Sequence, residues 1–274
     1  MQRLLLQTNN ILSSVRKFRN ILIIVAAVFF IYSYHKQIMR VGYKAYRYIK
    51  AKRVVPVYGK HQFSFPNKYA IHGVDISKWQ DEINWRQLKS CNLDGDTIQM
   101  KFVFIKATEG ALYEDPMFSD NWEAAKEVGI AKGAYHFYRP KINSTIQASN
   151  FIQSVQLMKG DLPPVIDIEE TDGKSKKEIV KGLKNYIEII EKKYGVKPII
   201  YSNVSFIEDY LADDFSEYHF WVAHYYVSDL HKIPGIKNLF WQHHDKIRIF
   251  GCANQIDANV FLGDEGLWKK LLIK

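Results

Sequence analysis

Two acidic side chains, separated by one residue, follow a short apolar run near the middle of the chain. Residues 164–170 read Pro-Val-Ile-Asp-Ile-Glu-Glu, and a polar stretch that contains a glycine follows them. An apolar run bounded in this way is typical of a buried strand that ends at a loop. Because side chains alternate along a strand, Asp167 and Glu169 should share one face, about 6.6 Å apart along the strand. Glu170 should point to the opposite face and be a bystander.

Two carboxyl groups this close together can divide the work of acid–base chemistry. Burial and mutual repulsion raise the pKa of one carboxyl, so that a proton donor lies beside an ionised partner. Cleavage of a glycosidic bond requires such a pair. A solvated acidic loop that caps the next helix would give the same local pattern, so the pair alone leaves both interpretations open.

From residue 69 onward, short apolar segments alternate with helical patterns. Repeating strand–helix units predict a parallel sheet. Eight strands in about 205 residues suit an α/β fold, a modified barrel of the TIM type with about five helices whose last helices are shortened or missing. The predicted strands are residues 71–76, 102–106, 131–137, 165–169, 197–201, 220–223, 239–242 and 255–261. The predicted helices lie near residues 84–90, 116–128, 144–157, 176–194 and 206–211.

The predicted strand ends are rich in carboxylates and aromatic side chains. In barrels of this kind the active site lies at the C-terminal ends of the strands. Aromatic rings can stack on sugar rings, and carboxylates and amides can bind hydroxyl and N-acetyl groups. Any one of these aromatic residues is more typical of a core, but their recurrence at the strand ends indicates a sugar-binding site. The residues in question are Asp75, Lys106, Glu109, Tyr135, Phe137, Asp167, Glu169, Tyr201, Trp221, His224, Gln242 and Asp257.

Seven segments of the chain, taken in order, resemble the successive motifs of glycoside hydrolase family 25, the lysozyme-type N-acetylmuramidases. They are Gly-Val-Asp-Ile-Ser-Lys-Trp-Gln (73–80), Phe-Ile-Lys-Ala-Thr-Glu-Gly (104–110), Gly-Ala-Tyr-His-Phe-Tyr (133–138), Pro-Val-Ile-Asp-Ile-Glu (164–169), Ile-Tyr-Ser-Asn (200–203), Phe-Trp-Val-Ala-His-Tyr (220–225) and Phe-Trp-Gln (240–242). The resemblance covers residues 70–268. It implies a barrel of eight strands and five helices, and an enzyme that cleaves the β-1,4 bond between N-acetylmuramic acid and N-acetylglucosamine in peptidoglycan. No cofactor or metal is implied.

The resemblance also implies roles for individual residues. Glu169 would be the general acid/base, and Asp167 would assist on the same face by orienting the substrate's N-acetyl group for neighbouring-group attack. Asp75 and Asp257 would complete the acidic floor. Glu109 would bind substrate, although a loop or helix-start carboxylate is an equal alternative. The other expected substrate-binding residues are Lys106, Tyr135, Phe137, Tyr201, Trp221, His224 and Gln242.

The basic character of the chain belongs to its N-terminal region. The net charge is +9, but residues 1–68 carry 13 Lys/Arg and no Asp or Glu, so the other 25 basic residues stand against all 29 acidic ones. This distribution argues against a nucleic-acid partner for the folded domain. Residues 18–34 form a mostly apolar run near the lower length limit for a membrane span. No small-x-small cleavage site follows it, which favours a single uncleaved anchor over a cleaved signal peptide.

We therefore expect two parts: a basic region with its anchor and a linker over residues 1–68, and the catalytic barrel over residues 69–274. Four basic residues lie between residue 1 and Arg19, at the start of the apolar run, and seven follow the run by residue 53. The positive-inside rule then places the barrel in the cytoplasm. Residues 41–55 could instead form an interfacial helix. Because the expected partners are peptidoglycan glycan strands and a membrane, we expect a membrane-anchored barrel outside the cytoplasm, in the periplasm or at the cell surface.

Three other functions stay open at this stage. A non-catalytic glycan-binding protein would keep the groove, although the presence of all four expected carboxylates argues against it. A metal-dependent hydrolase would use the same four carboxylates as oxygen ligands. A third alternative is hydrolysis of another N-acetylhexosamine polymer. Cys91 and Cys252 leave a long-loop disulfide and two free thiols equally open.

Overall fold

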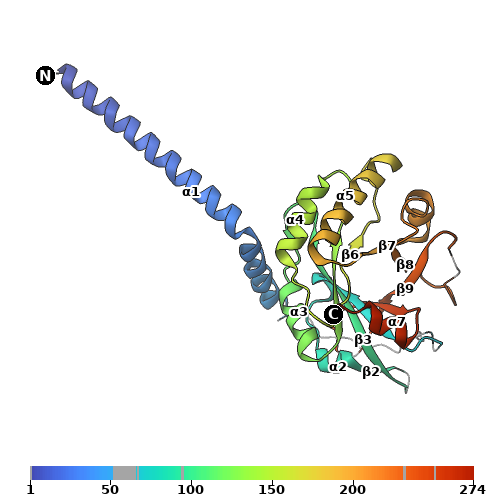
Figure 1. Ribbon diagram of the computed structural model, residues 1–274. Helices are drawn as coiled ribbons and strands as arrows, with labels where there is room; N and C mark the ends of the chain where they lie inside the picture. Colours follow the sequence, from blue (N-terminus) through green and yellow to red (C-terminus); the bar gives the residue numbers. More distant parts are fainter. Residues whose placement is uncertain (1, 52–65, 67, 94–95, 231–232, 250) are drawn as a thin grey trace. The chain divides into compact units, whose positions relative to one another are not determined.

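The computed structural model describes residues 2–51, 66, 68–93, 96–230, 233–249 and 251–274 (Figure 1). It consists of two compact units, Met1–Ile49 and Lys50–Lys274. The predicted linker at residues 62–67 lies outside the described residues, apart from Pro66.

Eight strands of the second unit form a closed barrel, which confirms the predicted fold. Neighbouring strands pair in the order β1–β10–β9–β8–β7–β6–β5–β3, and β3 pairs with β1 to close the ring. The strands are β1 (His72–Ile76), β3 (Asp96–Glu109), β5 (Ala131–Phe137), β6 (Val165–Asp167), β7 (Ile199–Asn203), β8 (His219–Ala223), β9 (Lys237–Ile247) and β10 (Ile256–Phe261).

The prediction of an all-parallel sheet is wrong for the last strand. β10 runs antiparallel to both of its neighbours, β1 and β9, whereas the other barrel pairs are parallel. A parallel connection needs a crossover of about a dozen or more residues, and the segment between Ile247 and Ile256 is shorter than that. The N-terminal end of β10 therefore lies at the same edge of the barrel as the C-terminal ends of the other strands.

All five predicted helices are present, and α7 (Glu265–Leu271) was not predicted. The five are α2 (Trp85–Lys89), α3 (Phe118–Glu127), α4 (Ser144–Ser154), α5 (Lys176–Tyr194) and α6 (Val204–Phe206), which continues into the π-helical turn η2 (Ile207–Leu211). The short η1 (Lys78–Gln80) follows β1, and β2 (Ser90–Leu93) and β4 (Tyr113–Glu114) pair with β3 outside the barrel.

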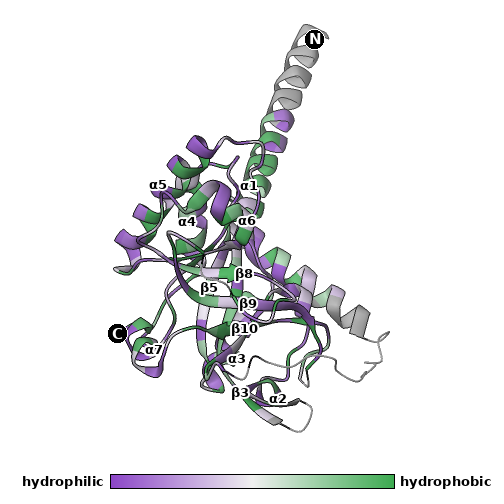
Figure 2. Ribbon diagram, turned by 90° about the vertical axis from the view of Figure 1, so that its right-hand side faces the viewer, coloured by the Kyte–Doolittle hydropathy of each residue, from purple (hydrophilic) through white to green (hydrophobic). Residues whose placement is uncertain are grey.

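The longest helix of the barrel unit, α5, shows why its sequence folds as predicted. Ser175 and Glu178 form a capping box at its start, and Gly195 ends it in the left-handed conformation. Figure 2 shows hydrophobic and hydrophilic residues alternating along the helix, and its buried residues recur at helical spacing. They are Ile179, Val180, Leu183, Tyr186, Ile187 and Ile190.

Strand alternation separates an aromatic interior from an aliphatic outer layer. Large rings fill the inside of the barrel, among them Phe102, Phe104 and Trp221, whereas residues such as Ile105 and Ile166 point outward into the cluster shared with the helices. Two glycines provide the space for the rings. A Cβ on Gly73 would lie 2.5 Å from the Phe102 ring, and one on Gly133 would lie 2.6 Å from the Phe104 ring.

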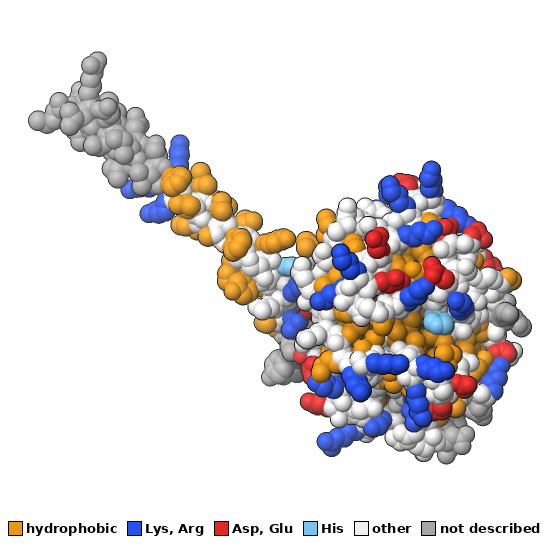
Figure 3. Space-filling view, viewed as in Figure 1, with side chains coloured by type: hydrophobic (Ala, Val, Ile, Leu, Met, Phe, Trp, Pro, Cys, Tyr) orange, Lys and Arg blue, Asp and Glu red, His pale blue; other side chains and the backbone are white. Residues whose placement is uncertain are grey.

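The first unit is the helix α1 (Gln2–Ala51). Within it, Arg16–Tyr43 is long and apolar enough to cross a membrane. Figure 3 shows hydrophobic side chains along this helix, and the predicted apolar run from Phe18 to Tyr34 lies inside it.

Candidate active site

A pocket of about 270 Å³ opens at the edge of the barrel where the predicted strand ends meet. Ten of the twelve residues selected from the sequence line it, and Glu109 and His224 do not. The ten are Asp75, Lys106, Tyr135, Phe137, Asp167, Glu169, Tyr201, Trp221, Gln242 and Asp257, joined by Ser77, Trp79, Gln80 and Tyr225. The pocket therefore combines four carboxyl groups with a wall of aromatic rings.

The side chains of Asp167 and Glu169 both face this pocket, as the alternation predicted. β6 ends at Asp167, but the extended backbone continues, because the Ile168 N–H donates to the Tyr201 carbonyl oxygen at 3.0 Å. Ile168 is fully buried in the outer layer, which leaves its two neighbours on the pocket side. Glu170 lies outside the pocket and bonds to Arg139.

Burial dominates the electrostatics of this pair. Burial and the Glu169 charge raise the pKa of Asp167 well above its usual value. Burial also raises the pKa of Glu169, while a hydrogen bond with Asp167 opposes that shift. Asp167 Oδ1 is buried and has no hydrogen-bond partner among the described residues. The pair therefore retains a proton at a pH where isolated carboxyl groups are ionised.

Asp75 and Asp257 face each other across the antiparallel pair of β1 and β10. Burial raises the pKa of Asp75 to about 6, against the opposing effect of hydrogen bonds from two amides. Burial and the Asp75 charge raise the pKa of Asp257 to about 9. The two facing carboxyl groups therefore retain a proton to higher pH than isolated carboxyl groups do, and Asp257 holds it more tightly than Asp75.

Amide and hydroxyl groups fix the orientation of Asp75. Gln242 Nε2 and Asn259 Nδ2 donate to Asp75 Oδ2 at 2.6 and 2.7 Å. The Gln242 oxygen in turn accepts from the hydroxyls of Tyr201 and Tyr225, at 2.6 and 2.7 Å. This network determines which end of the Gln242 amide faces Asp75. The orientation of the Asp75 carboxylate is therefore fixed before any substrate binds.

Lys106 is the one cation among the described residues that line this pocket. Its Nζ bonds to Glu109 Oε2 at 2.7 Å and lies 4.9 Å from the centre of the Phe137 ring. Glu109 Oε1 accepts two bonds from Arg139, from Nε at 3.0 Å and Nη2 at 2.7 Å. The pairing of β3 with β5 shifts register after Lys106. Glu109 thus lies behind Lys106, in the wall of a neighbouring pocket.

His224 points away from the pocket because of its position along the chain. Trp221 and Ala223 face the barrel interior, so the next residue with that orientation is Tyr225, which lines the pocket. The backbone of His224 takes part in the sheet edge instead, since its N–H donates to the Gln242 carbonyl oxygen at 3.1 Å. Counting by twos along the strand would have selected Tyr225, and likewise Asn259 from Asp257.

The donors around Asp75 bear on the metal-dependent alternative. Among the described residues, no group of three or more His, Cys, Asp or Glu side chains is placed to bind a metal ion. Asp75 Oδ2 receives two N–H donors, and a cation at that oxygen would face their positive ends. The surroundings of Asp75 therefore favour a carboxylate that accepts hydrogen bonds and stabilises a developing positive charge over one that binds a metal ion.

Comparisons with known proteins agree with the predicted resemblance. The model of glycosyl hydrolases family 25 matches residues 74–252. YegX of Escherichia coli O6:H1 (strain CFT073) is 37% identical over 257 residues, which cover 92% of this chain and 93% of YegX. Lysozyme M1 of Streptomyces globisporus is 33% identical over 210 residues, covering 70% of this chain and 68% of the lysozyme. The solved family 25 glycosyl hydrolase of Bacillus anthracis matches with a TM-score of 0.69 at 32% identity, over 79% of this chain and 100% of that one. The chain therefore belongs to glycosyl hydrolases family 25 and is a glycoside hydrolase of the lysozyme type.

Proposed function

We propose that this enzyme is a muramidase that hydrolyses the β-1,4 bond between N-acetylmuramic acid and N-acetylglucosamine in peptidoglycan. The observation that carries the proposal is the pair of the buried Asp167 and the half-buried Glu169 on one face of a pocket with aromatic walls. Relatives named lysozyme and N,O-diacetylmuramidase support it.

In the proposed reaction, Glu169 is the general acid and then the general base. The Asp167–Glu169 pair retains a proton because burial raises the pKa of both carboxyl groups, and Glu169 passes that proton to the glycosidic oxygen of the leaving sugar. Asp167 orients the N-acetyl group, whose carbonyl oxygen attacks the anomeric carbon as the glycosidic bond breaks. Water then attacks the same carbon, gives a proton to Glu169 and restores the N-acetyl group.

The remaining polar groups stabilise the charge that develops during this step. The Asp75 carboxylate faces the pocket and places its negative charge near the anomeric carbon, which becomes positive in the transition state. Tyr135, Phe137 and Trp221 offer ring faces and edges to the sugar, and Lys106 offers a donor to its hydroxyl or carbonyl oxygens. No step requires a cofactor.

The products of digestion test this proposal. The full chain in detergent is incubated with purified peptidoglycan, and the released sugars are identified by mass spectrometry. A muramidase yields fragments with N-acetylmuramic acid at the reducing end, and the activity should survive EDTA. Fragments that end in N-acetylglucosamine, or no release with binding retained, would contradict the proposed bond and favour another polymer or a glycan-binding protein.

The proposal includes a single membrane anchor within residues 1–68, with the barrel of residues 69–274 outside the cytoplasm. The apolar helix Arg16–Tyr43 supports an anchor by length and composition. The location follows from the substrate, because peptidoglycan lies outside the cytoplasm, and it opposes the simple count of basic residues around the helix.

A further inference from the structure

A second pocket, of about 590 Å³, adjoins the one that contains the four carboxyl groups. Trp79 and Lys106 line both pockets, so a substrate bound in the first has the second within reach. Two of its lining residues are apolar and face solvent, since Trp79 is 71% exposed and Leu112 is 51% exposed. The proposed hydrolysis assigns no role to this pocket.

Charges of both signs distinguish the second pocket from the first. Four basic and four acidic side chains line it, namely Lys78, Lys106, Arg139, Lys141, Glu109, Asp115, Glu170 and Asp172. A neutral sugar has no group that needs such a wall. A short peptide with both carboxylate and ammonium groups does, and in peptidoglycan each muramic acid can carry one.

Most of these charges already have partners within the protein. Arg139 bonds to Glu109 and to Glu170, and Lys106 bonds to Glu109. Asp115 accepts from the backbone N–H groups of Lys78 and Met117. These bonds make one side of the pocket a fixed framework rather than a set of free binding groups.

Asp172 and Lys141 are less fully engaged. The Asp172 side chain is only 5% exposed, yet its Oδ2 is buried with no hydrogen-bond partner among the described residues. Its Oδ1 lies 3.3 Å from Lys141 Nζ and 3.9 Å from Arg139 Nη1. A buried carboxylate oxygen without a donor costs free energy, and a ligand that supplies a donor recovers it. The Lys141 side chain, 61% exposed, can turn its ammonium toward a ligand carboxylate.

We propose that the second pocket binds the peptide stem attached to muramic acid, with Asp172 accepting from an ammonium group of the stem and Lys141 donating to one of its carboxylates. The exposed faces of Trp79 and Leu112 pack against its alanine methyl groups. This inference rests on the proposed function and adds specificity to it: the enzyme distinguishes stem-bearing glycan from bare glycan.

The test compares two soluble glycan substrates with the full chain in detergent. One keeps its stems after an endopeptidase has cut the cross-links, and the other has lost them to an amidase. Wild-type enzyme should cleave the stem-bearing strands with a several-fold higher kcat/KM, through a lower KM. Equal kcat/KM on both substrates would overturn the stem site while leaving the proposed hydrolysis intact, and no cleavage of either would refute the proposed hydrolysis itself.

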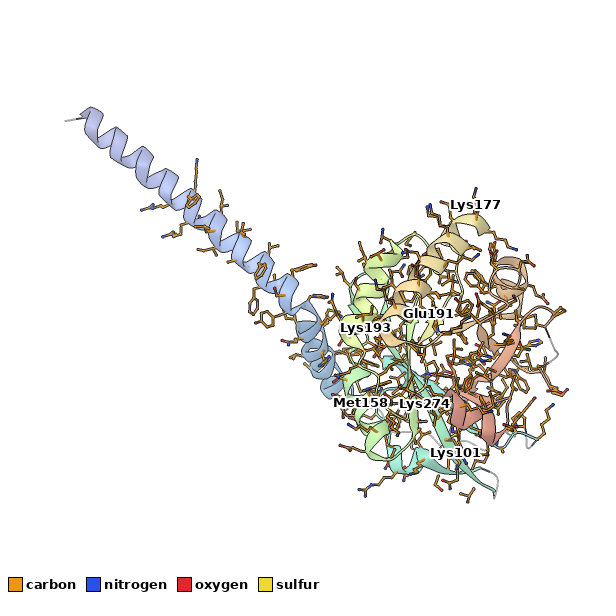
Figure 4. The ribbon with its side chains drawn as sticks, in the orientation of Figure 1. Lys101, Met158, Lys177, Glu191, Lys193 and Lys274 are labelled. Carbon is orange, nitrogen blue, oxygen red and sulfur yellow. The ribbon has the colours of Figure 1, made fainter. Side chains whose placement is uncertain are left out.

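Two variants locate the effect. Asp172→Asn keeps a residue that tolerates the positive φ of 48° at this position, and Lys141→Gln replaces the ammonium group by a neutral, shorter polar side chain. Because a hydrogen bond to a charged group is lost, each should lower kcat/KM on stem-bearing strands roughly tenfold and change it on bare strands by less than about twofold. Lys177→Gln, at an exposed position on α5 (Figure 4), is the matched control. Equal losses on both substrates would show a structural effect and contradict the proposal.

Discussion

At the residue scale, the candidate active site holds four carboxyl groups close together, and their mutual repulsion is unfavourable when they are ionised. The buried Asp75 lies opposite the half-buried Asp257, and the loss of hydration together with the Asp75 charge raises the pKa of Asp257 to about 9. The raised pKa of Asp257 makes the free energy of unfolding depend on pH.

Asp257→Asn should remove that dependence. The pKa of Asp257 rises from 3.8 to about 9 on folding, so the folded state binds the proton more tightly than the unfolded state. Stability is then fully present below pH 4 and is lost as the pH rises toward 9. We expect Asp257→Asn to raise Tm at pH 8 and to change it little at pH 4. A variant whose Tm falls equally at both pH values would contradict this assignment.

Lys106→Gln should shift the pH dependence of hydrolysis. The Lys106 charge lowers the pKa of both Asp167 and Glu169, against the dominant effect of burial. Without it, the acid form of the pair should persist to higher pH, and the alkaline limb of the kcat/KM profile should move upward. The rate is measured on peptidoglycan from pH 4 to 9, with Lys177→Gln as the control. A downward shift, or none, would show that Lys106 does not act on the pair.

The residues that line the pocket could be predicted in part from the sequence. The pair Asp167 and Glu169 follows from the alternation of a strand, which needs no tertiary information. The same alternation places Tyr225, and not the predicted His224, on the pocket side of the chain after β8. Glu109 could not be placed, because the register shift after Lys106 depends on how β3 pairs with β5.

At the element scale, the aromatic interior of the barrel constrains its strands. The Phe102 and Phe104 rings occupy the space above two glycines on neighbouring strands. This packing lies below the pocket and supports its floor, since Phe104 stacks on Trp221 at a ring distance of 4.4 Å.

Gly133→Ala should therefore destabilise the barrel. The added Cβ would lie 2.6 Å from the Phe104 ring and 3.1 Å from Leu162, and both of these side chains are fully buried. We expect a loss of about 1–3 kcal/mol in the free energy of unfolding, measured by urea denaturation. Gly266→Ala in α7 is the control, because its new Cβ would meet only the side chain of Asp264, at 3.2 Å. Equal stability of Gly133→Ala and wild type would contradict the close packing of the Phe104 ring against Gly133.

The positions of the strands and helices could be predicted from the sequence, but the direction of the last strand could not. Apolar runs and helical spacing located all eight barrel strands and five helices. The direction of β10 was missed because it follows from the length of the β9–β10 connection, which a strand count ignores. The additional strand β2 pairs with the extended start of β3, and the apolar runs gave no sign of that hairpin.

At the scale of the whole molecule, the proposed membrane anchor can hold the barrel on either side of a membrane. The proposed substrate requires the barrel outside the cytoplasm, whereas the basic residues after the apolar helix favour the inside. A protease added to cells with opened outer barriers should digest residues 70–274 of the proposed anchored enzyme while the cytoplasmic membrane is intact. Protection until that membrane is permeabilised would place the barrel in the cytoplasm and contradict the proposal.

The proposed acid chemistry of this barrel depends on one half-buried carboxyl group, that of Glu169, and Glu169→Gln tests this role most directly. The change keeps the size of the side chain and removes its proton. The rate of peptidoglycan hydrolysis should fall by about 100-fold or more, with an unchanged fold by circular dichroism. Glu188→Gln, at an exposed position on α5, should hydrolyse at the wild-type rate. A folded Glu169→Gln enzyme with wild-type activity would contradict the role of Glu169 as the general acid.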